Sequence, residues 1–288
     1  MPSERDILDR LRRFSPGIGD DCFVYRPSPG EELLFTTDLL IEDVHFRRST
    51  HSASDIGYTA AARGLSDLAA MGAAPRFLML SLALPKWADS RFAGRVFAGL
   101  REHGVPLSGG DLSHAPLLIC DIVACGSARR GTSLRRSGAR PGDSIYVSGS
   151  LGGSALGLAI GHGRALHRHL RPEPRIALGE YLRARKKATA AMDLSDGLSL
   201  DLARLCRESG VAAEIEAPPI FPGATIEQAL HGGEDYELLF TSHSFVPLLH
   251  KGVPITKIGM IVAGQPGAVL LNGRKLRALG YDHFARQK

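Results

Sequence analysis

Several features that would assign this chain to a common functional class are missing from its sequence. The four cysteines form no Cys-x-x-Cys pair, and no histidine and cysteine group has the spacing of a zinc site. The longest near-apolar stretch, residues 77–85, is too short to cross a bilayer. Residues 3–10 are charged and lack the apolar segment of a signal peptide. We therefore expect a cytoplasmic protein that does not contact a membrane.

Two standard nucleotide-binding motifs are also absent. No Gly-x-x-x-x-Gly-Lys-[Ser/Thr] sequence occurs, which excludes a P-loop enzyme. Residues 17–19 begin like a dinucleotide fingerprint, but Cys22 stands where a third glycine is required. A Gly/Ser loop at 150–157 could meet phosphate at a helix N-terminus or could be an ordinary connection, and the sequence leaves both readings open.

The positive charge of the chain does not indicate a nucleic-acid surface. The formal net charge is +5, and many arginines fall between residues 91 and 185. They are scattered, and no nucleic-acid motif accompanies them. We favour a solvated basic surface on a protein with anionic ligands, and we expect no nucleic-acid partner.

Helical and strand-like patterns alternate along the chain. Helices are predicted at 4–13, 54–71, 89–103, from about 153, at 174–184 and at 198–208. Strands are predicted at 33–37, 41–46, 77–84, 117–125, 145–148, 190–193, 212–216, 236–241 and 255–262. This mixture indicates an α/β or α+β fold. The turn-rich segment 137–143 is the expected boundary between a domain at 1–138 and a domain at 139–288.

Carboxylates stand beside Gly, Ser or Thr in six separate segments, which we interpret as short turns. The segments are 17–21, 36–38, 66–67, 109–111, 193–197 and 232–235. Glycine lets a backbone approach a ligand closely, and Mg²⁺ prefers oxygen ligands, usually one or two carboxylates together with water and substrate phosphates. Each motif alone is equally typical of a helix cap or a turn. Together they suggest several Mg²⁺ ions around a polyphosphate.

These segments and others resemble the thiamine-monophosphate kinase family in order and spacing along nearly the whole chain. The matching sequences are GIGDD at 17–21, TTDLLIEDVHF at 36–46, LSDLAAMGAAP at 65–75, GGD at 109–111, RSGARPGDSIYVSGSLGGSALGL at 136–158, DLSDGL at 193–198, GGEDYELLFT at 232–241 and GYDHF at 280–284. DLSDGL and GGD alone would indicate only the wider superfamily of aminoimidazole-ribonucleotide synthetase and selenophosphate synthetase. GGEDYELLFT with GYDHF points to the thiamine-phosphate branch.

The resemblance implies a fold, an assembly and a reaction. It implies a two-domain α/β subunit with an aminoimidazole-ribonucleotide synthetase-like fold, whose N-terminal sheets pair in a homodimer with the ATP site near that interface. It implies transfer of a phosphoryl group from ATP, with Mg²⁺, to thiamine monophosphate, which gives ADP and thiamine diphosphate in the last step of making that cofactor.

The resemblance also assigns roles to residues. Positions matching the family's magnesium-associated residues are Asp21, Thr36, Thr37, Asp38, Asp67, Asp111, Asp193 and Asp196. Positions matching its ATP contacts are Gly110, Asp111, Arg136 and Ser195, and those matching its thiamine-phosphate contacts are His45, Glu234 and Tyr281. We expect Asp38, Asp196 and Arg136 to be essential for catalysis.

Three departures from the family pattern concern the acceptor site. Asp43 replaces the usual glycine, residues 112–114 replace the usual Thr-Thr-Arg-like sequence, and the stretch 219–232 is short. The alternatives are another ATP-dependent enzyme of the superfamily with a different small phosphorylated substrate, or a nucleotide-binding regulator without turnover. Selenophosphate synthesis is disfavoured because the first 21 residues contain no cysteine, and a hydrogenase-maturation role because the last five contain none.

Overall fold

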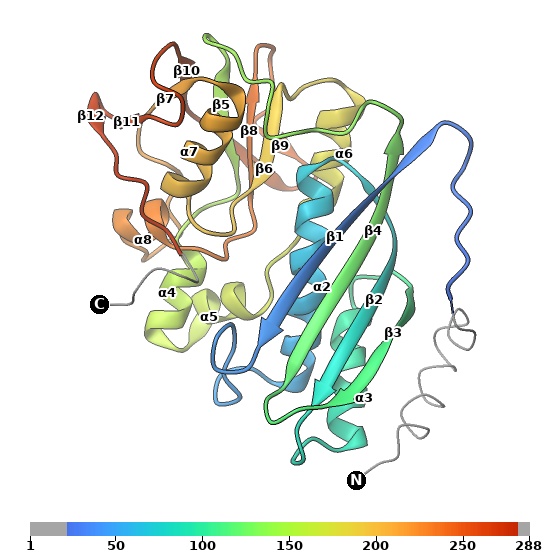
Figure 1. Cartoon of the computed structure of the whole chain (residues 1–288). Coiled ribbons are helices and arrows are strands. Elements are labelled where there is room, and N and C mark those ends of the chain that lie inside the picture. Colours follow the sequence, from blue (N-terminus) through green and yellow to red (C-terminus); the bar gives the residue numbers. More distant parts are fainter. Residues whose placement is uncertain (1–21, 282–288) are drawn as a thin grey trace. The chain divides into compact units, whose positions relative to one another are not determined.

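The computed structural model describes residues 22–281, which form two compact units (Figure 1). Within those residues, the first unit comprises the chain up to Leu68 together with Ala74–Gly131, and the second comprises Ala69–Ala73 and the chain from Thr132 onward. The turn-rich segment 137–143 therefore lies inside the second unit. None of the helices in residues 22–281 combines the length and apolar character that a membrane span needs.

The first unit is built on a mixed four-stranded sheet. Its strands are β1 (Glu31–Ile41), β2 (Ala74–Leu84), β3 (Leu107–His114) and β4 (Ile119–Arg129), in the spatial order β1-β4-β2-β3. β4 runs antiparallel to both β1 and β2, whereas β2 and β3 are parallel. β1 and β3 are thus the two edges of the sheet.

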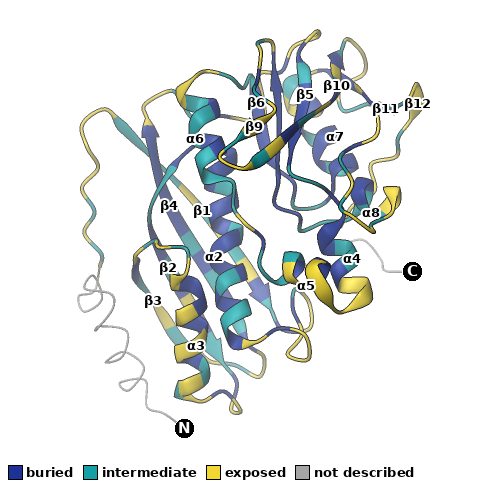
Figure 2. Ribbon diagram, turned by 180° about the vertical axis from the view of Figure 1, so that it is seen from behind, coloured by how far each residue is buried: buried dark blue, intermediate teal, exposed yellow. Residues whose placement is uncertain are grey.

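Helices cover one face of this sheet (Figure 2) and leave much of the other open (Figure 1). α2 (Ala53–Ala70) and α3 (Ser90–Arg101) lie on the covered face. Asp89 caps α3 by accepting a hydrogen bond from the Phe92 N–H at 2.7 Å. On the other face Phe35 and Leu39 of β1 are 61% and 45% exposed, although the rings of Phe23 and Tyr25 cover Phe77 there. An apolar sheet face is therefore left partly exposed.

The second unit contains a larger sheet with helices packed on it. Its strands are β5 (Ser144–Ser148), β6 (Ala190–Asp193), β7 (Ala212–Ile215), β8 (Leu238–Ser242), β9 (Leu249–His250), β10 (Val253–Val262), β11 (Val269–Leu271) and β12 (Arg274–Lys275). The spatial order is β12-β11-β7-β10-β5-β8-β6, and β9 pairs with β10. Its helices are α4 (Gly153–Ile160), α5 (Gly163–Leu170), α6 (Ile176–Ala184), α7 (Leu198–Ser209) and α8 (Ile226–His231).

Alternation along β5 divides the core of the second unit between two faces. Ile145 and Val147 pack in the cluster that contains the apolar side of α7, whereas Tyr146 packs in the cluster that contains Leu178 and Leu182 of α6. Each face of the sheet is therefore covered by a helix.

Two expectations about local structure are wrong. Residues 41–46 form a turn after β1 rather than a strand, because Asp43 adopts a left-handed backbone (φ 63°) and its N–H bonds to the Phe46 carbonyl at 2.8 Å. Three of the six acidic segments are not turns: 36–38 lies in β1, 66–67 in α2 and 109–111 in β3. The expected helix at 4–13 and the segment 17–21 lie outside the described residues. Within residues 22–281, the sequence analysis did not predict α5, α8, β3 or the short strands β9, β11 and β12.

Candidate active site

One group of predicted magnesium ligands lies on the helix-covered face of the first sheet. Thr36 and Asp38 are two positions apart on β1 and therefore lie on the same face of the sheet, and Arg63 and Asp67 lie one turn apart on α2. Thr36 Oγ1 donates a hydrogen bond to Asp67 Oδ2, and Nε and Nη2 of Arg63 each lie 3.3 Å from Asp38 Oδ1. The structure thus brings Thr36, Asp38 and Asp67 together.

The electrostatics of this group favour a further cation. Burial raises the pKa of Asp38 above its ordinary value, Arg63 opposes the shift, and the charges of Asp67 and Asp121 add to it. Neighbouring carboxylates and burial both disfavour the ionised form, so a bound positive charge would stabilise it. Arg63 supplies part of that charge.

Thr37 and Asp111 lie on the opposite face of the same sheet. Thr37 Oγ1 donates to Asp121 Oδ1 at 2.7 Å, and the register places Asp121 beside Ser81, which is in turn beside Asp111. Asp111 is exposed there. The preceding Gly110 has φ 150°, and a Cβ on it would lie 1.9 Å from the Leu80 carbonyl oxygen, so only glycine fits. The predicted ligands of the first unit are therefore divided between two faces.

His45 is held by the turn that follows β1. Its Nδ1 accepts a hydrogen bond from the Ile41 N–H at 3.0 Å, which places the ring proton of the neutral imidazole on Nε2. The left-handed conformation of Asp43 explains why this position suits glycine, and aspartate is among the residues that tolerate it. The departure from the family pattern at Asp43 thus leaves the turn intact.

In the second unit, the predicted metal ligand Asp193 is the last residue of β6, and Ser195 and Asp196 lie in the turn between β6 and α7. Asp201 Oδ2 accepts hydrogen bonds from the N–H groups of Asp196 and Gly197 at 3.0 and 3.1 Å and thereby shapes this turn. Burial raises the pKa of Asp201 to about 6. The Asp196 carboxylate pairs with Arg204, whose Nη1 also lies 2.9 Å from Asp201 Oδ1.

The segment with Glu234 and the C-terminal Tyr281 both pack against this turn. The Glu234 N–H donates to the Ser195 carbonyl at 2.8 Å, and the Tyr236 N–H donates to the Leu194 carbonyl at 2.9 Å. The Tyr281 N–H donates to the Asp196 carbonyl at 3.2 Å. Four predicted site residues from three distant segments, Ser195, Asp196, Glu234 and Tyr281, are thereby brought together by backbone hydrogen bonds.

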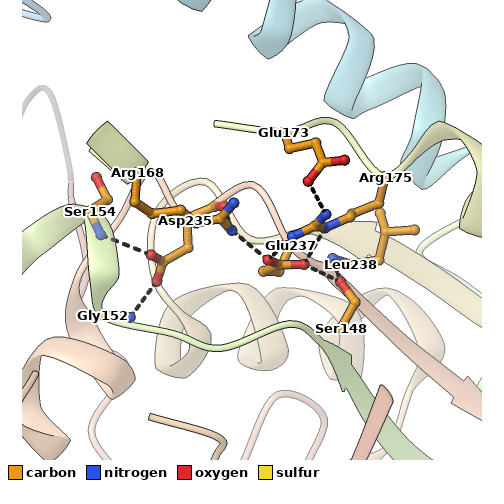
Figure 3. Close-up of polar contacts among 9 residues, drawn as sticks. All are labelled: Ser148, Gly152, Ser154, Arg168, Glu173, Arg175, Asp235, Glu237 and Leu238. Atoms are coloured by element: carbon orange, nitrogen blue, oxygen red, sulfur yellow. Dashed lines mark hydrogen bonds and ion pairs between the residues drawn. The ribbon is translucent and has the colours of Figure 1, made fainter. Parts of the chain in front are cut away.

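A buried ion-pair network surrounds Glu237, three residues along the chain from Glu234 (Figure 3). The Glu237 carboxylate accepts hydrogen bonds from Arg168, from Nε and Nη2 of Arg175 at 2.7 and 2.5 Å, and from Ser148 Oγ. Burial acts to raise the pKa of Glu237, but Arg175 and Arg168 outweigh it and hold that pKa below its ordinary value. Gly149 is required here, because a Cβ on it would lie 2.1 Å from Glu237 Oε1.

Asp235 determines whether the Gly/Ser loop at 150–157 can bind phosphate at the N-terminus of α4. Its Oδ2 accepts from the Gly152 N–H at 2.6 Å and its Oδ1 from the Ser154 N–H at 3.1 Å, so a buried carboxylate occupies the N-terminus of α4 (Figure 3). Burial raises the pKa of Asp235 to about 6, and the two N–H donors oppose the shift. A phosphate at this terminus would have to displace Asp235, so the loop is a structural connection.

Arg136 lies in an irregular segment beside the start of β6. The Ala191 N–H donates to the Arg135 carbonyl at 2.8 Å, and Ser209 Oγ donates to the Arg136 carbonyl at 3.0 Å. Its side chain is exposed. The backbone is thus anchored while the guanidinium stays accessible to an anionic ligand.

Sequence comparison assigns this combination of segments to a family. Residues 19–128 match the family "AIR synthase related protein, N-terminal domain" and residues 140–268 match "AIR synthase related protein, C-terminal domain". The thiamine-monophosphate kinase of Escherichia coli K12 is 39% identical over an alignment that covers 93% of this chain and 92% of that protein. The chain belongs to the thiamine-monophosphate kinase family. The enzyme of Bacillus subtilis 168 is 35% identical, with 93% of each chain covered.

Solved structures agree with this membership. The thiamine-monophosphate kinase of Stenotrophomonas maltophilia K279a has a TM-score of 0.82 and 34% identity, covering 95% of this chain and 98% of that one. A structure described as AaThiL complexed with AMPPCP and TMP has a TM-score of 0.79 and 32% identity, covering 98% and 97%. Hydrogenase maturation protein HypE in complex with ATP shares the fold, with a TM-score of 0.76 at 18% identity. The expected two-domain fold is confirmed.

The predicted metal ligands of this member of the thiamine-monophosphate kinase family have the chemistry that Mg²⁺ requires. Its predicted ligands offer only carboxylate and hydroxyl oxygens, the atoms that Mg²⁺ prefers. No group of three His, Cys, Asp or Glu side chains within residues 22–281 is arranged to hold a metal ion unaided. That is compatible with Mg²⁺, because the ion usually takes only one or two protein carboxylates and completes its shell with water and substrate phosphate.

Sequence reasoning missed the residues that support this site. It gave a role to Glu234 but none to Asp235, which it counted only within the acidic segment 232–235. It did not single out Glu237, nor Arg168 and His169 on α5. A signal was present, since three acids within four positions next to a buried strand require cationic or N–H partners. The sequence could not say which of its many arginines would supply them.

Proposed function

We propose that this chain transfers the γ-phosphoryl group of ATP to thiamine monophosphate and releases ADP and thiamine diphosphate. Relatives named thiamine-monophosphate kinase match over more than nine-tenths of the chain. A structure of the same fold holds an ATP analogue and TMP. The observation that carries the proposal is the junction of the Ser195–Asp196 turn with Glu234 and Tyr281, which joins a predicted ATP contact to two predicted acceptor contacts.

Each proposed contact matches the chemistry of its ligand. Arg136 can pair with phosphate oxygens of ATP, and Ser195 with Gly110 and Asp111 completes the proposed nucleotide contacts. The thiazolium ring of the acceptor is cationic, which suits the carboxylate of Glu234 and the aromatic face of Tyr281. His45 offers its Nε2–H to the acceptor phosphate, because Nδ1 already accepts from Ile41.

We assign Mg²⁺ to the carboxylates of both units. The proposed ligands are Asp21, Thr36, Thr37, Asp38, Asp67, Asp111, Asp193 and Asp196, of which Asp21 lies outside the described residues. Mg²⁺ at these residues would neutralise phosphate charge during transfer. Arg63 and Arg204 pair with Asp38 and Asp196, so each of these carboxylates already faces one positive charge.

We infer direct in-line transfer without a phosphoenzyme and without an essential general base. A phosphate monoester has a second pKa of about 6, so the attacking oxygen is largely ionised at neutral pH. The remaining barrier is repulsion between anions, which the Arg136 guanidinium offsets. His45→Gln, whose amide can reproduce the Nε2–H, should therefore retain turnover.

We also propose that the protein is a homodimer formed through the sheets of the first unit. The support is the partly exposed apolar face that carries Phe35 and Leu39. Pairing of two such faces would bury these side chains.

Product analysis tests the proposed reaction. The purified protein is incubated with ATP, Mg²⁺ and thiamine monophosphate, and products are identified by mass. Thiamine diphosphate together with ADP is expected. ATP consumption only with another phosphorylated small molecule would reassign the chain within its superfamily, and nucleotide binding without turnover would make it a regulator.

A further inference from the structure

The last turn of α5 contacts the Glu234 segment at two successive residues. Arg168 Nη2 donates to the Asp235 carbonyl at 2.7 Å. Its neighbour His169 has Nδ1 3.5 Å from Glu234 Oε2 and 2.9 Å from Ser154 Oγ. The His169 side chain is only 4% exposed, whereas that of Glu234 is 31% exposed. A buried imidazole therefore lies behind a carboxylate that reaches solvent.

The neighbours of His169 are themselves fixed. The Ser154 N–H bonds to Asp235 Oδ1 at 3.1 Å, so the serine cannot move without disturbing the N-terminus of α4. Glu234 has a left-handed backbone (φ 63°), a conformation that non-glycine residues adopt only where their surroundings hold it. A proton on His169 Nδ1 faces both Ser154 Oγ and the Glu234 carboxylate, whereas a lone pair there would repel the carboxylate.

We propose that His169 is a positioning residue for the acceptor: its Nδ1–H holds the Glu234 carboxylate in place to receive the cationic ring of the substrate. The proposal rests on the proposed function, in which Glu234 contacts the thiazolium ring. A free glutamate side chain has several rotamers, and fixing one before binding removes an entropic penalty from the binding step. His169 thereby determines affinity for the cationic acceptor without touching it or ATP.

Three substitutions at His169 separate positioning from packing. His169→Asn places an amide N–H near the position of Nδ1, His169→Gln places it nearer to Nε2, and His169→Leu removes the donor. His167→Asn is the matched control, because His167 lies on the same helix and is exposed. Steady-state kinetics give KM for thiamine monophosphate and for ATP separately, and thermal unfolding reports the folded state of each variant.

The Leu and Gln variants should raise KM for thiamine monophosphate about tenfold, the effect of about 1.4 kcal/mol. Their KM for ATP should stay within about twofold, while the Asn variant and the His167 control should resemble the parent. Equal changes in both KM values, or no rescue by Asn, would overturn the proposal. If the His169→Leu variant does not fold, comparison of His169→Asn with His169→Gln still tests whether the donor at Nδ1 sets KM for thiamine monophosphate.

Crystal structures separate failure of this inference from failure of the proposed function. An inactive parent protein would refute phosphorylation of thiamine monophosphate but would leave the position of Glu234 measurable. The Glu234 carboxylate should move or become disordered in His169→Gln and stay in place in His169→Asn. An unchanged carboxylate in both variants would show that His169 does not position it.

Discussion

The buried Glu237 carboxylate makes a strong prediction about stability. Its side chain is 1% exposed, forms ion pairs with both Arg168 and Arg175, and accepts a hydrogen bond from Ser148 Oγ. Glu237→Gln keeps the shape but leaves two guanidinium groups without their shared anion. Breaking a buried ion pair by removing one partner typically costs about 3–5 kcal/mol. We expect the free energy of unfolding of the second unit to fall by about that amount.

Glu173→Gln is the matched control for this experiment. Glu173 pairs with the same Arg175 at 2.7 Å, but its side chain is 70% exposed. An exposed pair of this kind typically contributes about 0–1 kcal/mol. Urea denaturation of both variants at neutral pH, followed by circular dichroism, gives the comparison. Equal and small losses in the two variants would refute the reasoning that burial of Glu237 makes its ion pairs decisive.

Three further predictions concern metal, pH and assembly. Asp38→Asn and Asp196→Asn should each lower kcat by at least about a hundredfold with an unchanged circular dichroism spectrum, and EDTA should abolish activity; full activity in EDTA would exclude the assigned role of Mg²⁺. Burial raises the pKa of Asp201 from its ordinary 3.8 to about 6, so the folded state binds more protons than the unfolded state and loses stability as pH rises through that window. Asp201→Asn should therefore gain about 3 kcal/mol relative to the parent between about pH 4 and about pH 7, and urea titrations that show a constant difference would contradict this. The parent should be a dimer by light scattering and Leu39→Glu a monomer, whereas a monomeric parent at micromolar concentration would refute pairing through the sheets.

Periodicity predicted most of the fold because it reports burial directly. The strand 145–148 and the helix 198–208 were recovered closely, since their apolar spacing matches the faces that the core covers. The turn at 41–46 was mistaken for a strand, because its alternating residues hide the left-handed backbone of Asp43. β3 was missed because its sequence, LSGGDLSH, has glycines and polar residues in place of β-branched ones.

The predicted site residues were found through family resemblance, and their supporting contacts were not. Thr36 and Thr37 look equivalent in sequence, yet strand alternation places them on opposite faces of the sheet. Arg63 and His169 contact the predicted site carboxylates of Asp38 and Glu234 from helices that are distant in sequence. Such pairings depend on tertiary packing, which local patterns do not encode.

The most direct test of the proposed reaction is a single-turnover experiment with ATP labelled on its γ-phosphate. Excess protein is mixed with the labelled ATP, Mg²⁺ and thiamine monophosphate, quenched at short times, and separated into protein and small molecules. We expect label to pass from ATP to thiamine diphosphate with no label on the protein, and free thiamine not to substitute as acceptor. Protein-bound label that later passes to the acceptor, or efficient labelling of free thiamine, would contradict this expectation.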